Sequence, residues 1–97
     1  MGVYSLSNAA EADFENLYEY GILTFGIEQA RQYALLLKDG MQTLADNVKL
    51  GRTAYEFAPG LRRLTCGSHI LFYLPISNGI LVVRILHQSM NFKRHGF

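Results

Sequence analysis

Residues 61–87 constrain the fold more than any other part of the chain, because their pattern predicts three β-strands joined by two tight turns. Gly67-Ser68 and Asn78-Gly79 are typical two-residue hairpin sequences, since Gly and Asn tolerate the positive φ that such turns require. Two-residue turns at these positions predict which residues face each other. The predicted pairs are Cys66–His69, Leu64–Leu71 and Arg62–Tyr73 in the first hairpin, and Leu74–Val83, Tyr73–Arg84 and Phe72–Ile85 in the second.

This register assigns the side chains to two faces of the sheet, because directly opposed residues in an antiparallel pair point to the same side. One face is apolar and should cover a core: Leu61, Ile70, Phe72, Leu74, Leu81, Val83 and Ile85, with Arg63 and Thr65 towards an edge. The other face carries a row of Arg62, Tyr73 and Arg84, flanked by Cys66 and His69. We expect this second face to be the binding surface, although Leu64, Leu71, Val82 and Leu86 make it partly apolar.

The first half of the chain predicts one strand and two helices. Val3 to Leu6 is a short apolar run, and Asn8 with Glu11 forms a capping-box pattern that opens a helix ending near Gly21. The second helix has the clearest periodicity, with apolar residues at 3–4 spacing: Ala30, Tyr33, Ala34, Leu37, Met41, Leu44, Ala45 and Val48. Tyr33 is expected in the core, and Gly40 suggests close packing against a neighbour. A further short strand is possible within residues 53–57.

Together these elements predict an α+β fold of order β-α-α-β-β-β, in which a helical hairpin packs on one face of a small, mainly antiparallel sheet. With 97 residues and 49% hydrophobic content, the chain should form a single domain, residues 1–97. The single Cys66 cannot form an intrachain disulfide, so a reducing, cytoplasmic setting fits best. No stretch has the length of a membrane span, so no membrane association is expected.

Charge is distributed unevenly along the chain. Residues 1–48 carry two basic and seven acidic side chains, whereas residues 49–97 carry seven basic side chains and only Glu56 as an acid. Such a basic half would attract an acidic partner, either nucleic acid or an acidic protein segment. The alternative is that the helices simply carry the acids and the strands carry the bases.

The sequence lacks the common signatures of cofactor and metal chemistry. It has no P-loop, no dinucleotide-binding glycine motif and no Cys/His cluster with metal-ligand spacing, so we expect neither cofactor nor metal. The row of Arg62, Tyr73 and Arg84 could grip a phosphate or stack on an aromatic group, or could merely cover an apolar sheet face. His69 could in principle move a proton. For His87, either the strand ends near Leu86 or the ring is buried and hydrogen-bonded.

Several short motifs resemble the ParE branch of the RelE/ParE toxins of bacterial toxin–antitoxin pairs. They are Phe25-Gly26, Gln29-Ala30, Tyr33, Gly51-Arg52, Pro59-Gly60-Leu61-Arg62, Ser68-His69, Phe72-Tyr73, Arg84-Ile85-Leu86-His87 and Met90. Each is weak alone, but their order and spacing in a chain of this length are fairly specific. Two positions depart from the family pattern: Val48 replaces a usual Pro, and Asn91 replaces a usual Asp after the Met.

The resemblance implies the same β-α-α-β-β-β order and a cognate ParD-like antitoxin that wraps and neutralises the toxin. It also implies inhibition of DNA gyrase by trapping the cleaved-DNA complex, without catalytic residues and without sequence-specific nucleic-acid binding. The alternative is RelE-type cleavage of messenger RNA on the ribosome, and a third possibility is a domain that has lost activity. The residues expected to bind the target or antitoxin are Arg62, Arg63, His69, Tyr73, Arg84, His87, Met90, Lys93 and Arg94.

Overall fold

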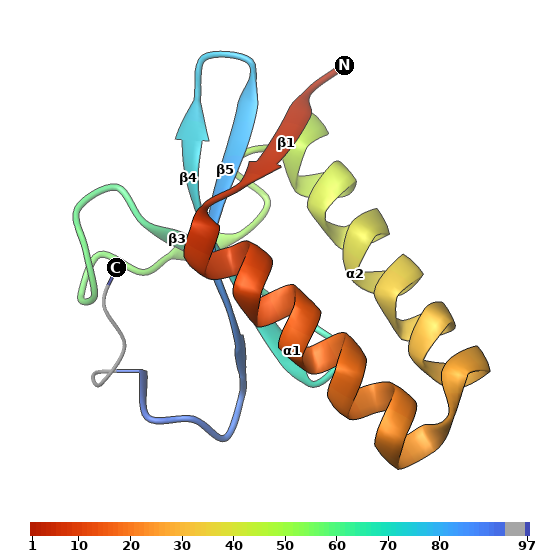
Figure 1. Cartoon of the computed structure of the whole chain (residues 1–97). Coiled ribbons are helices and arrows are strands. Elements are labelled where there is room, and N and C mark those ends of the chain that lie inside the picture. Colours follow the sequence, from red (N-terminus) through yellow and green to blue (C-terminus); the bar gives the residue numbers. More distant parts are fainter. Residues whose placement is uncertain (93–96) are drawn as a thin grey trace.

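The computed structural model describes residues 1–92 and 97, and it contains two helices and five strands (Figure 1). The elements are β1 (Val3–Leu6), α1 (Asn8–Phe25), α2 (Ile27–Asp46), β2 (Arg52–Thr53), β3 (Arg62–Cys66), β4 (His69–Ile76) and β5 (Gly79–His87). This order confirms the predicted α+β fold, with the two-residue β2 in place of the possible strand at residues 53–57. The basic residues Lys93 and Arg94 lie outside the described residues.

The five strands form one mixed sheet with the spatial order β1-β5-β4-β3-β2. β1 pairs with β5 in parallel and the other neighbours are antiparallel. Figure 1 shows α1 and α2 running side by side across one face of this sheet. The parallel pair begins at Val3 and Gly79, where a Cβ on the glycine would overlap the Val3 carbonyl oxygen. Glycine therefore allows the first strand to approach the end of the second hairpin.

The helices begin and end at positions that differ slightly from those predicted. Ser7, not Asn8, is the N-cap of α1, because its Oγ accepts a hydrogen bond from the Ala10 amide at 3.0 Å. The helix does not end near Gly21. It continues to Phe25, since Gly21 provides room for Ala30 of α2, whose Cβ would lie 3.3 Å from a Cβ at that glycine.

The α2 stripe lies in the core as its periodicity predicts. Six of its residues are buried: Ala30, Ala34, Leu37, Met41, Leu44 and Ala45. The predicted close packing at Gly40 is also present, because a Cβ there would lie 2.9 Å from Cys66 Sγ on β3. Tyr33 differs from the prediction: it is only half-buried and its hydroxyl reaches the β3–β4 turn.

The predicted register of the first hairpin is confirmed, and that of the second is wrong. The second turn falls at residues 77–78, one position earlier than predicted, so that Tyr73 pairs with Val82. A β-bulge follows, because Phe72 pairs with Arg84 and leaves Val83 as an extra residue on β5. Because of this extra residue, the β5 side chains after Val83 point to the opposite face of the sheet from the one that regular alternation would give them.

The predicted assignment of the two sheet faces is also wrong. Residues of the expected binding face, including Leu71, Tyr73 and Val82, pack beneath the helices, and Tyr73 is 0% exposed. The expected core face is instead covered by the β2–β3 connection and by Phe92, which follows β5, in a second cluster. Its members are Ala54, Leu61, Ile70, Phe72 and Leu86, with Phe57, Ala58, Leu74, Val83 and Phe92 around them. Both faces are apolar because both are covered.

Candidate binding groove

The predicted row of Arg62, Tyr73 and Arg84 is not a continuous exposed surface. The Tyr73 hydroxyl lies under the helices, where it donates to the Val48 carbonyl at 2.8 Å and accepts from the Gly51 amide at 3.0 Å. Arg62 donates from Nε and Nη2 to the Gly51 carbonyl at 3.0 and 2.6 Å. Both side chains therefore hold the segment that leads into β2. A target cannot reach Tyr73 while the domain is folded.

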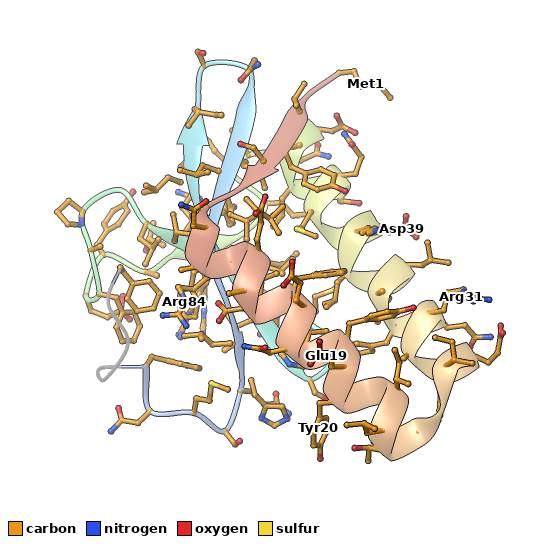
Figure 2. All side chains as sticks on the ribbon, viewed as in Figure 1. Met1, Glu19, Tyr20, Arg31, Asp39 and Arg84 are labelled. Atoms are coloured by element: carbon orange, nitrogen blue, oxygen red, sulfur yellow. The ribbon has the colours of Figure 1, made fainter. Side chains whose placement is uncertain are left out.

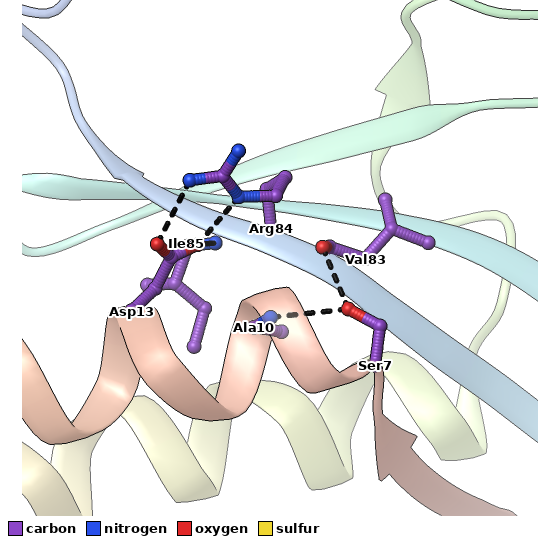
Figure 3. Close-up of polar contacts among 6 residues, drawn as sticks. All are labelled: Ser7, Ala10, Asp13, Val83, Arg84 and Ile85. Atoms are coloured by element: carbon purple, nitrogen blue, oxygen red, sulfur yellow. Dashed lines mark hydrogen bonds and ion pairs between the residues drawn. The ribbon is translucent and has the colours of Figure 1, made fainter. Parts of the chain in front are cut away.

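Arg84 is separated from the other two because it pairs with α1. Its Nε and Nη2 contact the two carboxylate oxygens of Asp13 at 2.8 and 2.9 Å, and Asp13 Oδ2 also accepts from the Ile85 amide at 2.9 Å (Figure 3). Ser7 Oγ donates to the Val83 carbonyl one step earlier along the same strand edge. Beyond the end of β1, side chains at the start of α1 thus supply the hydrogen bonds to the backbone edge of β5. The hydrogen bond to Asp13 raises the pKa of Arg84 further above its usual value.

A groove of about 850 Å³ lies between the helical hairpin and the C-terminal end of β5. We call it the hairpin groove. Its lining comes from α1 and α2, the β3–β4 turn and the segment after β5, with Tyr20, Phe25, Tyr33, His69, His87 and Met90 among its residues. Three of the predicted site residues, His69, His87 and Met90, therefore meet in one place. Of the predicted arginines that the structure describes, Arg62, Arg63 and Arg84 do not line this groove.

A hydrogen-bonded chain connects α2 to the β3–β4 turn at the floor of the groove. The Tyr33 hydroxyl accepts from the Ser68 amide at 2.9 Å and lies 2.6 Å from His69 Nδ1. Since the hydroxyl has one proton to donate, it satisfies a neutral His69 whose Nδ1 is unprotonated. Burial raises the pKa of the Tyr33 hydroxyl, which keeps that donor proton in place.

His69 and His87 lie edge to face, with their ring centroids 5.3 Å apart, because the bulge brings them opposite each other on β4 and β5. Burial lowers the pKa of His69, the neighbouring His87 lowers it further, and Asp13 acts in the opposite direction. Neither alternative for His87 holds as stated: β5 includes it, and the ring is hydrogen-bonded, accepting from the Ser89 amide at 3.1 Å, but it is only half-buried. Both rings present polar edges to a mainly apolar groove.

The helical end of the groove carries exposed apolar residues that the sequence did not single out as binding residues. Tyr20 and Phe25 line the groove, and Leu23 and Ile27 lie beside them around the break between the helices. All four are exposed, Leu23 at 88% and Phe25 at 62%. Figure 2 shows Tyr20 at the free end of the hairpin, away from the sheet. Such an exposed apolar patch is typical of an interaction surface, and the apolar run around Gly26 was the sequence signal for it.

Within residues 1–92 and 97, no three His, Cys, Asp or Glu side chains gather where they could hold a metal ion. The described helices are also too short or too polar to cross a bilayer. The lining of the hairpin groove combines aromatic side chains, two imidazole rings and the carboxylate of Asp13, which is paired with Arg84. Such a combination suits recognition of an amphipathic protein segment.

Comparison with known proteins gives a consistent family. Residues 4–92 match the model of the ParE toxin of the type II toxin–antitoxin system parDE. Toxin ParE1 of Mycobacterium tuberculosis is 40% identical over 93 residues, covering 95% of each chain, and Toxin ParE1 of Caulobacter vibrioides is 35% identical over 95 residues, covering 98% of each. A solved structure titled "Chromosomal ParDE TA system from P. aeruginosa" has the same fold, with a TM-score of 0.75 at 22% identity, over 90% of this chain and 96% of that one. The chain therefore belongs to the ParE toxin family of type II toxin–antitoxin systems.

Proposed function

We propose that residues 1–97 act in the cytoplasm as one toxin domain that inhibits DNA gyrase by direct binding and is neutralised by a cognate ParD-like antitoxin. Family membership supports this proposal most strongly, because the family model matches residues 4–92. In this proposal the toxin has no catalytic residue. It acts by trapping the complex of gyrase with cleaved DNA.

The side chains of the sheet favour inhibition over RNA cleavage. Cutting RNA at the 2′-hydroxyl needs a base, an acid and free cations around the phosphate. Two of the candidate groups on the sheet are already engaged: Tyr73 bonds two backbone groups and Arg84 pairs with Asp13. A RelE-type ribonuclease would have to break these contacts before each reaction.

The hairpin groove is the surface we assign to the antitoxin. Its lining is mainly apolar and aromatic, and it is large enough for several side chains of an amphipathic segment. His69, His87 and Met90 would lie beneath that segment. An acidic antitoxin segment is expected to continue onto the basic second half of the toxin.

The proposal is tested by titrating purified toxin into a gyrase supercoiling assay and, in parallel, into a translation extract with a defined messenger RNA. We expect loss of supercoiling with accumulation of cleaved DNA, and restoration by the cognate antitoxin. The messenger RNA should remain intact in the extract. Site-specific RNA cuts together with normal supercoiling would show that the toxin is a ribonuclease.

A further inference from the structure

We infer that the sheet edge formed by β2 and β3 binds the phosphate backbone of duplex DNA, as a second contact of the toxin on the gyrase–DNA complex. We call this edge the arginine edge and define it by Lys49, Arg52, Arg62 and Arg63, of which Arg52 and Arg63 point to one face of the sheet and Arg62 to the other. It lies at the far end of the sheet from β1 and contributes no residue to the hairpin groove. The choice of DNA as the ligand rests on the proposed function.

The first observation is a direct opposition of like charges. Arg52 and Arg63 face each other in the antiparallel pair of β2 and β3, so both side chains point to the same side of the sheet. Directly opposed like charges destabilise a strand pair. β2 is only two residues long, so the arginine pair is one of the two residue pairs that it makes with β3. A strand of two residues makes few hydrogen bonds and side-chain contacts that could offset the repulsion between the two guanidinium groups.

The second observation is the lack of neutralising carboxylates. The two ion pairs of the described residues are Arg31–Glu28 and Arg84–Asp13, and neither involves the arginine edge. Arg62 is held by backbone carbonyls, including Lys49 O at 3.1 Å, and therefore keeps its full charge. The one acidic residue after Asp46 is the exposed Glu56.

The third observation concerns the Arg63 guanidinium. Its Nε is buried without a hydrogen-bond partner, although the residue as a whole is only half-buried. A buried donor without a partner on a charged group is energetically costly. A phosphate at the surface cannot reach this buried Nε, so it would bind the guanidinium through its outer Nη atoms. The partial burial also holds the side chain in place before binding.

Duplex DNA suits this edge better than a peptide. The backbone carries one negative charge for about every 1.7 Å of helix axis, so adjacent cations can each meet a phosphate. Exposed Thr53 and Tyr55 add hydroxyl donors beside the arginines, and such groups are common partners of phosphate oxygens. The edge has no helix that could enter a groove, so it would bind DNA without reading its sequence.

The test uses the full chain and a fluorescently labelled mixed-sequence DNA duplex, with binding followed by anisotropy between about 50 and 150 mM KCl. Contacts to three or four phosphates predict that affinity falls about 20-fold to 50-fold across this range. The double variant Arg52→Gln/Arg63→Gln should lower the salt dependence by about two phosphate contacts and weaken binding about tenfold at low salt.

The matched control is Arg31→Gln/Lys38→Gln, which removes the same charge from the exposed face of α2, where Figure 2 shows Arg31 pointing outward. This variant should bind DNA like the wild type. Equal binding by the wild type and the arginine-edge variant would overturn the inference. So would stronger binding to polyglutamate, or to duplex RNA, than to DNA at equal charge concentration.

A supercoiling assay with the same variants separates this inference from the proposed function. If the wild type fails to inhibit gyrase, the proposed function fails, while the DNA titration still decides whether the arginine edge binds phosphates. If the wild type inhibits gyrase, the arginine-edge variant should need several-fold more protein for the same inhibition, and the α2 control should not. Unfolding curves of each variant establish that the fold is retained.

Discussion

The hydroxyl of Tyr73 satisfies two backbone groups that the fold would otherwise leave buried and unpaired. It bonds the Gly51 amide and the Val48 carbonyl, which lie on the segment between α2 and β2. The same residue was expected on an exposed surface, together with two arginines. Its burial means that its contribution to function is indirect, through the position of the arginine edge.

Tyr73→Phe should therefore lower stability without directly removing a target contact. The substitution leaves a buried amide and carbonyl without a partner, and we expect a loss of about 1–3 kcal/mol in the free energy of unfolding. Chemical denaturation of the two proteins measures this loss. Under conditions where the variant is fully folded, gyrase inhibition should be normal. An unchanged stability with lost inhibition would instead indicate that Tyr73 contacts the target.

His69 should make stability depend on pH below neutrality. Its folded pKa is lowered, chiefly by burial, from an unfolded value near 6.5, so the unfolded state binds its proton first as the pH falls. The contribution of neutral His69 is therefore fully present above pH of about 6.5, and it is lost as the pH falls from there through the lowered folded pKa. Tyr33, His87 and Asp13 face the same ring and contribute to its environment.

The measurement compares the free energy of unfolding of the wild type and His69→Gln at pH of about 7.5 and 5.5. The difference between the two proteins in the free energy of unfolding cancels the contribution of the carboxylates, because both proteins contain the same carboxylates. The wild type should lose more stability than the variant on acidification. A larger loss in the variant would reverse the sign that burial of His69 predicts.

At the scale of elements, the order of strands and helices follows from the sequence because each element carries its own pattern. The 3–4 stripe of α2 and the Gly67-Ser68 turn are local signals, and both agree with the structure. The face that the helices cover is not a local property. Both faces of β4 are apolar, since one packs under the helices and the other under Phe57 and Phe92.

The errors in the candidate site have the same origin. A one-residue shift of the second turn and a bulge at Val83 move Arg84 away from Tyr73 and bring His87 opposite His69. Neither feature has a sequence signal as clear as a glycine turn, and both lie where β5 meets residues from outside the hairpin: β1 pairs with its first residues, and Ser7 and Asp13 bond Val83 and Arg84. His69, His87 and Met90 were predicted individually, but their convergence with Tyr33 depends on these tertiary contacts.

The packing of α2 on β3 can be measured through Gly40 and Cys66. Gly40→Ala should gain about 1 kcal/mol in helix propensity but lose about 1–3 kcal/mol from overlap with Cys66 Sγ, for a net loss of about 1 kcal/mol. In a Cys66→Ala background the overlap with sulfur is removed, so the same change should be neutral or stabilising. A double-mutant cycle from denaturation curves tests this coupling. Purely additive effects would contradict the close approach of α2 to β3 at this position.

At the scale of the whole molecule, the two covered faces of the sheet leave two separate surfaces for partners. The hairpin groove is apolar and lies between the helices and the end of β5. The arginine edge is cationic and lies on β2, β3 and the residues just before β2, at the edge of the sheet farthest from β1. Their separation would allow an antitoxin segment to fill the groove without covering the arginine edge.

Antitoxin affinity should therefore depend on the groove and not on exposed apolar residues in general. Phe25→Ser removes an exposed aromatic side chain from the groove lining, and loss of such an anchor at an interface typically costs about 2 kcal/mol or more, a weakening of at least about 30-fold. Leu35→Ser is the matched control, because Leu35 is 55% exposed on α2 but does not line the groove. Calorimetric titration with the cognate antitoxin measures both variants. Equal weakening by the two substitutions would show that the antitoxin binds another face of the helices.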